Sequence, residues 1–185
     1  LESEERKARE NGYPLSVIYL DLDNFSEFIR KYGNEMADQV IRSVGGYVLQ
    51  NTEKGEIASS DYYDGDGFMI IMPSVGIEEA ARRAEALREL IAGFSLDEKF
   101  VSEVFINEGE VTASIAVATV SVDGPDILEK LELALDRAKT TGKNKVCIYE
   151  EVIFELPARG LSVVKLDTQN FFRYRDDVLR IAKWL

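Results

Sequence analysis

A nearly continuous apolar run at residues 15–22, LSVIYLDL, constrains the fold more than any other feature of the sequence. Its length suits a β-strand and is well short of a membrane span. Because apolar residues point to both sides of this strand, both faces of its sheet need cover. We therefore expect a central strand with helices packed against the sheet.

The apolar patterns that follow this strand define a topology. Two helical patterns come first, then two strand patterns, and then helix, strand, helix and strand, at residues 24–33, 34–52, 56–63, 68–73, 76–94, 111–120, 124–142 and 144–150. The two adjacent strand patterns predict a hairpin. The kernel of this order is the β-α-β-β-α-β pattern of ferredoxin-like folds, so we predict an α/β (α+β) fold with a mixed sheet.

Two details of the helical patterns lead to specific expectations. Gly45 and Gly46 lie inside the helix at residues 34–52, where each costs roughly 1 kcal/mol relative to Ala, so we expect a close packing point there. On the helix at residues 76–94, the spacing predicts i,i+4 ion pairs of Glu78 with Arg82 and Glu79 with Arg83.

The ends of the chain differ from its middle. Residues 1–12 are charged and helix-prone and stop at a glycine, as expected of the end of an upstream helix. Residues 151–185 predict a C-terminal extension of two short strands and a helix, so we expect a main domain over residues 1–150. Since the sequence does not begin with Met, we expect it to be a piece of a longer protein.

Composition excludes several classes of function. The chain has 22 basic and 34 acidic residues and a net charge of −12, which disfavours binding to nucleic acid and to anionic membranes. It contains no His, and its single Cys147 allows neither an internal disulfide nor a paired-cysteine metal site. Without an apolar membrane span or signal peptide, a cytoplasmic location is expected, either alone or as the cytosolic part of a membrane-anchored sensor.

Acidic side chains cluster where the first strand and the hairpin are expected to meet. Asp21 ends the first strand, and Asp66 lies in the hairpin turn DGDG at residues 64–67. Two carboxylates at short range favour a cation between them, and Mg²⁺ with bound phosphates suits such a site. A structural alternative remains open: Asp23 or Asn24 would cap the next helix, and the Asp-Gly turn would be an ordinary hairpin turn.

Four blocks of sequence together resemble the GGDEF domain family, the diguanylate cyclases of bacterial cyclic di-GMP signalling. They occur in the family's order across residues 1–150, and they read VIYLDLDNFSEFIRKYGNEMADQVI, YYDGDGFMIIMP, VTASIAVA and LDRAKTTGKNKV. The resemblance implies a palm-type α/β fold, with the signature loop carried by the hairpin. In active members it implies condensation of two GTP molecules across a homodimer with Mg²⁺.

The resemblance also implies roles for individual residues. Asp21 and the backbone of Leu22 match metal-binding positions, and Asp66 matches the metal-binding and catalytic acidic position of the signature loop. The nucleotide-binding positions match an acidic residue that recognises guanine, a glycine of the signature loop and two basic residues that hold the triphosphate: Asp38, Gly65, Lys139 and Lys143.

The chain departs from the family pattern at several of these positions. Asp64 replaces the first glycine of the signature, Gly67 replaces its glutamate, and Ile29 replaces the asparagine that contacts guanine. An unpaired polar edge in a buried pocket costs roughly 1–3 kcal/mol. Residues 55–58 read GEIA, where the resemblance predicts the Arg-x-x-Asp inhibitory motif.

Three functional hypotheses follow. The first is a degenerate GGDEF domain with impaired catalysis, acting as a regulatory, nucleotide-binding or interaction module beside neighbouring signalling domains. The second is an active cyclase that uses GTP or another nucleoside triphosphate with Mg²⁺. The third is a scaffold that binds no ligand, in which Asp21 and Asp66 are solvated turn residues.

Overall fold

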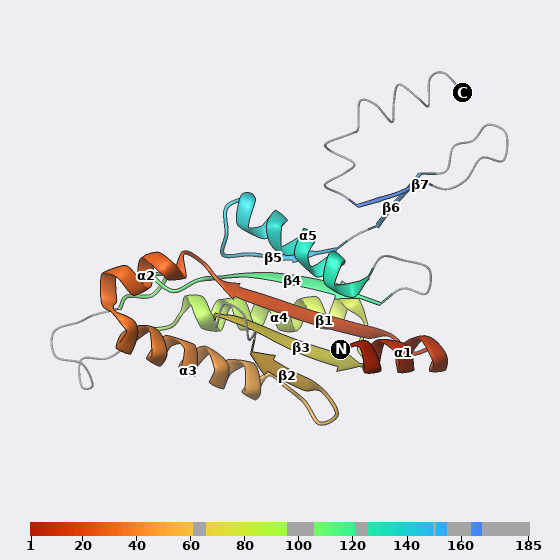
Figure 1. The fold of residues 1–185 in the computed structure, drawn as a ribbon, viewed down its shortest axis with the longest axis horizontal. Coiled ribbons are helices and arrows are strands. Elements are labelled where there is room, and N and C mark those ends of the chain that lie inside the picture. The colour runs from red at the N-terminus through yellow and green to blue at the C-terminus, as the bar shows by residue number, and fades with distance from the viewer. Residues whose placement is uncertain (61–65, 96–105, 121–125, 150, 155–163, 168–185) are drawn as a thin grey trace, which may run out of the picture. The chain divides into compact units, whose positions relative to one another are not determined.

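The protein is described by a computed structural model, in which residues 1–60, 66–95, 106–120, 126–149, 151–154 and 164–167 are placed well enough to describe (Figure 1). The chain divides into two compact units, residues 1–148 and 149–185, each of which is described by itself. In the described part of the chain, no helix combines the length and the apolar character needed to cross a membrane.

The first unit contains five helices and five strands in the described ranges. In chain order they are α1 (Glu2–Asn11), β1 (Leu15–Leu22), α2 (Phe25–Tyr32), α3 (Asn34–Gln50), β2 (Ile57–Ser60), β3 (Gly67–Pro73), α4 (Ile77–Ala92), β4 (Ala113–Thr119), α5 (Ile127–Thr140) and β5 (Val146–Ile148). This order agrees with the order predicted from the sequence. Helix α1 ends at Gly12, whose φ of 70° is the left-handed conformation expected of a C-terminal cap.

The five strands form one mixed sheet in the order β2-β3-β1-β4-β5. Strand β1 pairs antiparallel with both β3 and β4, and only the β4–β5 pair is parallel. The predicted central strand is therefore confirmed, as is the predicted hairpin of β2 and β3. The α+β fold class is confirmed with them.

Both faces of β1 are buried, as its apolar run predicts. Ile18, Leu20 and Leu22 belong to the main core, together with residues of α3 and α4. Val17 points to the opposite face and is also fully buried. Helix α5 buries Leu131 and Ala134 and packs mainly on β4, so the sheet is covered by helices on both faces.

The prediction for the glycine pair in α3 is right for one residue. A Cβ on Gly45 would lie 3.4 Å from the Phe68 ring, which is a close approach of the helix to β3. A Cβ on Gly46 would meet nothing within 4 Å, so close packing does not explain that glycine.

The predicted ion pairs on α4 are wrong. Arg82 pairs with Glu79, at i,i+3, and Arg83 reaches a different part of the chain. Its guanidinium donates two hydrogen bonds to the Glu56 carboxylate, at 2.6 and 2.7 Å, and a further one to the Asn51 carbonyl. The Glu56 side chain is only 5% exposed, so Arg83 gains a nearly buried bidentate partner in place of a solvated neighbour.

This pair perturbs the titration of Glu56. Burial alone would raise the pKa of Glu56, but the Arg83 hydrogen bonds and one from the Glu53 N–H outweigh it. The pKa of Glu56 therefore lies below its ordinary value of 4.5. The pair joins the segment before β2 to α4.

The second unit contains an antiparallel hairpin of β6 (Glu151–Phe154) and β7 (Val164–Asp167), with Phe154 opposite Val164. The two strands predicted for the extension are thus present. The helix predicted after them lies outside the described residues.

We predict that Glu56→Gln lowers the free energy of unfolding by about 2 kcal/mol at neutral pH, because one charge of a hydrogen-bonded pair is removed. The folded-state pKa of Glu56 is depressed, so this stabilisation is present above pH 4.5 and is lost as the pH falls through the folded-state pKa. Urea unfolding at pH 7 and at about pH 3 measures the difference, which should shrink at the lower pH.

The matched control is Glu79→Gln, which removes the exposed partner of Arg82. Its effect should stay below about 0.5 kcal/mol at both pH values. An equal effect of the two substitutions at pH 7 would contradict the prediction.

Candidate functional site

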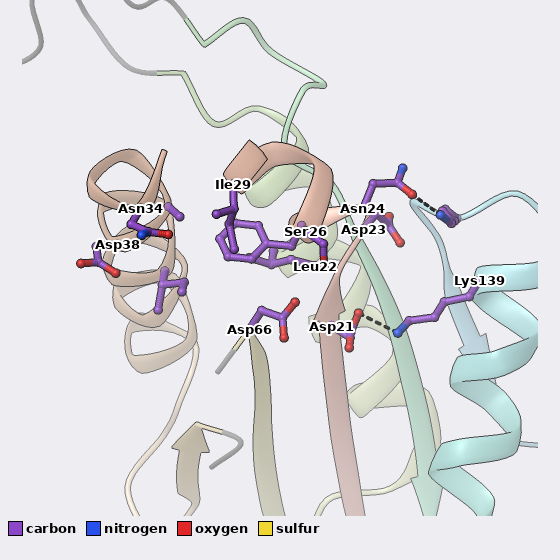
Figure 2. Close-up of a pocket in the computed structure, with 14 residues that line it drawn as sticks. Asp21, Leu22, Asp23, Asn24, Ser26, Ile29, Asn34, Asp38, Asp66 and Lys139 are labelled. Carbon is purple, nitrogen blue, oxygen red and sulfur yellow. Dashed lines mark hydrogen bonds and ion pairs between the residues drawn. The ribbon is translucent and has the colours of Figure 1, made fainter. Parts of the chain in front are cut away.

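The pairing of β1 with β3 determines where the two candidate acidic residues lie. Asp21 stands opposite Gly67 in the antiparallel register, so Asp66 adjoins the same strand end. Both line a cleft of about 610 Å³ at this end of the sheet. Figure 2 shows Asp21 and Asp66 at adjoining strand ends, with Asp38 on α3 across the cleft from Lys139.

Nearly all residues predicted for the site line this one cleft. The predicted residues that line it are Asp21, Leu22, Asp38, Asp66, Lys139 and Lys143. They come from β1, α3, the start of β3, α5 and the α5–β5 loop. Gly65 and Asp64 lie outside the described residues. The cleft is therefore assembled from segments that are far apart in the sequence.

Asp21 already has a cationic partner within the protein. The Nζ atom of Lys139, in the last turn of α5, lies 2.7 Å from Oδ1 of Asp21. The Asp21 side chain is 19% exposed and that of Lys139 is 38% exposed, so the pair faces the cleft. A bound cation would have to compete with this ammonium group for Asp21.

The donors at this strand end are oxygen atoms of the kind that Mg²⁺ binds. Asp21, Asp66 and the backbone of Leu22 would hold it, and Mg²⁺ usually completes its shell with water and substrate phosphates. Among the described residues, no group of three or more acidic, His or Cys side chains is positioned to bind a metal.

The opposite wall of the cleft is mainly apolar, with two polar groups. Ile29, Ala37 and Ile41 line it from α2 and α3. Ile29 offers an aliphatic surface at the position where the family resemblance implies a hydrogen-bonding side chain. Asn34 and Asp38 lie one helical turn apart on α3, and both line the cleft.

Asp23 does not cap α2, so the structural alternative considered for it is wrong. Asn24 is the N-cap residue, with a φ of 54°, and its side chain makes no capping hydrogen bond. The Asp23 carboxylate is buried and instead accepts hydrogen bonds from Ser114, Thr112 and the backbone of Asn144. The Asn24 carboxamide oxygen accepts a hydrogen bond from Lys143.

Sequence reasoning missed two contributions to this site. The first is Asn34, which lines the cleft beside the predicted Asp38. Their spacing of four residues in a helical pattern was a usable signal that both side chains lie on the same face of the helix. The role of Asp23 had no local signal, because its partner residues lie 89 to 121 positions away in the chain.

Comparisons with a family model and with known proteins agree on one family. The family described as "Diguanylate cyclase, GGDEF domain" matches residues 1–145. The chain is 28% identical over 150 residues to the diguanylate cyclase DosC of Escherichia coli and 27% identical over 149 residues to the response regulator PleD of Caulobacter vibrioides. These alignments cover 77% and 79% of this chain, but only 30% and 32% of the two relatives.

Solved structures agree with this match. The GGDEF domain of DgcB from Caulobacter crescentus, solved in complex with c-di-GMP, is 25% identical, with a TM-score of 0.71 over 80% of this chain and 85% of that one. The active GGEEF domain of a diguanylate cyclase from Vibrio cholerae has a TM-score of 0.68 at 23% identity, covering 81% of this chain and 92% of that domain, and supports the fold.

We predict that Lys139→Met strengthens the binding of Mn²⁺ alone, because it frees Asp21 from its ammonium partner. The gain should be up to about 1 kcal/mol, or roughly fivefold, since the pair is partly exposed. Isothermal titration with MnCl₂ in the absence of nucleotide measures it.

The control for this prediction is Lys143→Met, because the hydrogen bond of Lys143 goes to the neutral side chain of Asn24. This substitution removes the same charge from the cleft without freeing a carboxylate. If Mn²⁺ binds equally well to wild type and to Lys139→Met, the ion pair does not compete with the metal.

Proposed function

The chain belongs to the GGDEF domain family of diguanylate cyclase-like, cyclic di-GMP signalling proteins, and on this premise we propose that it is a catalytically impaired member. In this proposal it binds a nucleoside triphosphate in the cleft and acts as a regulatory or interaction module. Neighbouring domains of a longer protein, a homodimer and a cytoplasmic location are parts of the same proposal.

One observation carries the proposal: Gly67 stands opposite Asp21. The family resemblance implies a glutamate at the position of Gly67. Cyclisation requires a hydroxyl to be activated and a pyrophosphate to leave, both of which place negative charge near this strand end. A bound Mg²⁺ would supply Lewis-acid stabilisation for that charge. A cleft with one carboxylate fewer orients and retains metal ions less well, so we expect the chemical step to suffer most.

The binding part of the proposal is supported by the lining of the cleft. Lys139 and Lys143 bring positive charge to one side, as an anionic ligand requires in a chain of net charge −12. Ile29, Ala37 and Ile41 offer an apolar surface on the other side, suited to the face of a base. The two lysines and the apolar wall are therefore present, although Gly67 replaces the glutamate that the family resemblance implies.

The first test is direct binding and turnover. Isothermal titration with GTP, ATP and cyclic di-GMP in the presence of Mg²⁺ should give heat with at least one triphosphate, and pyrophosphate release should stay at background. A turnover rate like that of an active family member would overturn the impairment. Absence of binding for every nucleotide would leave only the interaction role.

Base selectivity provides a second prediction. Ile29→Asn should strengthen GTP binding relative to ATP by roughly tenfold, because a carboxamide restores a hydrogen bond to a polar base edge. The control Ile29→Val keeps the apolar surface and should leave the GTP-to-ATP ratio unchanged. An unchanged ratio for Ile29→Asn would show that the base does not lie against α2.

A weak cyclase is the second candidate function, because Asp21, Asp66 and Lys139 still line one cleft. If the missing carboxylate limits this activity, Gly67→Glu together with Asp64→Gly should raise pyrophosphate release from GTP by at least roughly tenfold. Gly67→Gln together with Asp64→Gly is the control, equal in size but uncharged. Equal rates for the two double variants would contradict a role for the charge.

A further inference from the structure

We propose that Asp23 is a positioning residue, which fixes the α5–β5 loop so that Lys143 presents its ammonium group to the triphosphate of a bound nucleotide. Asp23 is buried but also lines the cleft, and in this proposal it acts through the α5–β5 loop and not by touching the ligand. The inference rests on the proposed nucleotide-binding function, and it assigns to this residue a role that neither its sequence position nor its neighbours in the chain indicate.

The Asp23 carboxylate is the junction of three separate segments. Its Oδ1 accepts a hydrogen bond from Ser114 Oγ at 2.7 Å, and its Oδ2 accepts one from Thr112 Oγ1 at 2.8 Å. Oδ2 also accepts a hydrogen bond from the backbone N–H of Asn144 at 2.9 Å. The first two bonds join the end of β1 to the start of β4, whereas the third reaches the loop after α5.

The backbone of that loop adopts an uncommon conformation. Gly142, Lys143 and Asn144 have φ values of 122°, 60° and 44°, three successive residues in the left-handed half of the map. Lys143 and Asn144 carry a Cβ, and this region is unfavourable for Lys although Asn adopts it more readily. The hydrogen bond from the Asn144 N–H to Asp23 is charge-assisted, and it anchors the residue that directly follows Lys143.

In this proposal, the conformation of the α5–β5 loop determines where the Lys143 side chain lies. Lys143 immediately precedes the anchored Asn144, lines the cleft, and donates a hydrogen bond to the carboxamide of Asn24. That partner is neutral, whereas the ammonium group of Lys139 is engaged by the carboxylate of Asp21. Of these two lysines, Lys143 is the one whose positive charge is not compensated by its hydrogen-bond partner, so its ammonium group can pair with an incoming phosphate.

The geometry separates positioning from a general structural role. Removing the Ser114 hydroxyl takes one hydrogen bond from Oδ1 of Asp23 but leaves the contact between Oδ2 and Asn144. Replacing Asp23 by Asn removes the negative charge that accepts the hydrogen bond of the Asn144 N–H. A merely structural carboxylate would make both substitutions alike in their effect on ligand binding, whereas a positioning residue makes them differ.

The experiment uses ¹⁵N-labelled protein, with inorganic triphosphate and Mg·GTP as probes in separate titrations. Asp23→Asn and Lys143→Met should each weaken binding of both probes by roughly tenfold. The double variant should be no weaker than Lys143→Met alone, since both changes act through one ammonium group. Ser114→Ala should bind like wild type even where it lowers the melting temperature.

A spectroscopic measurement on the wild-type protein keeps the proposal decidable if Asp23→Asn does not fold. The exposed Asn144 should show a backbone amide protected from hydrogen exchange and shifted downfield by its carboxylate acceptor. An amide that exchanges at the unprotected rate would overturn the inference. Additive losses in the double variant, or unchanged affinity in a folded Asp23→Asn protein, would also overturn it.

Two binding results distinguish failure of the nucleotide-binding function from failure of the role of Asp23. Wild-type protein that binds neither probe removes the proposed nucleotide function and this inference with it. Wild-type protein that binds Mg·GTP, with an Asp23→Asn variant that binds it equally well, removes the inference alone.

Discussion

The register of β1 between β3 and β4 is the constraint on which the rest of this structure depends. It sets Asp21 opposite Gly67 on one side and opposite Ser114 on the other. Because side chains alternate between the faces of a sheet, a slip of one residue would exchange the faces of every side chain on β1. Such a slip would turn the Asp21 side chain toward the face on which Ile18, Leu20 and Leu22 form the main core. The cost of burying that carboxylate opposes the slip, so the core also orients the acidic end of the strand.

Much of the fold was predictable because its signals are local. The apolar run of β1, the 3.6-residue spacing of α3 and α4, and the left-handed cap at Gly12 each act over a few neighbouring residues. The candidate site was predictable through the family resemblance and through the expected meeting of Asp21 with the hairpin. The cleft contains both Asp21 and Asp66, although their roles as ligands stay predictions.

The interactions that sequence reasoning missed are those in which a side chain binds a partner far away in the chain and not a neighbour. Arg83 had acidic neighbours on its own helix but binds Glu56, because a bidentate pair shielded from water gains more than a solvated i,i+4 contact. Asp23 lies where its side chain could have capped α2, but it accepts hydrogen bonds from segments about a hundred residues away. No spacing rule contains that information, since it arises only after the sheet has formed.

The short outer strands of the sheet have a consequence for how this unit meets other proteins. Among the described residues, strand β2 has four residues and β5 has three, so these parts of the two edges present few unpaired backbone groups. A partner that docked by β-augmentation would gain only a handful of main-chain hydrogen bonds. A partner of this unit would find larger contact areas on its helical surfaces and loops, where side-chain identity can discriminate between partners.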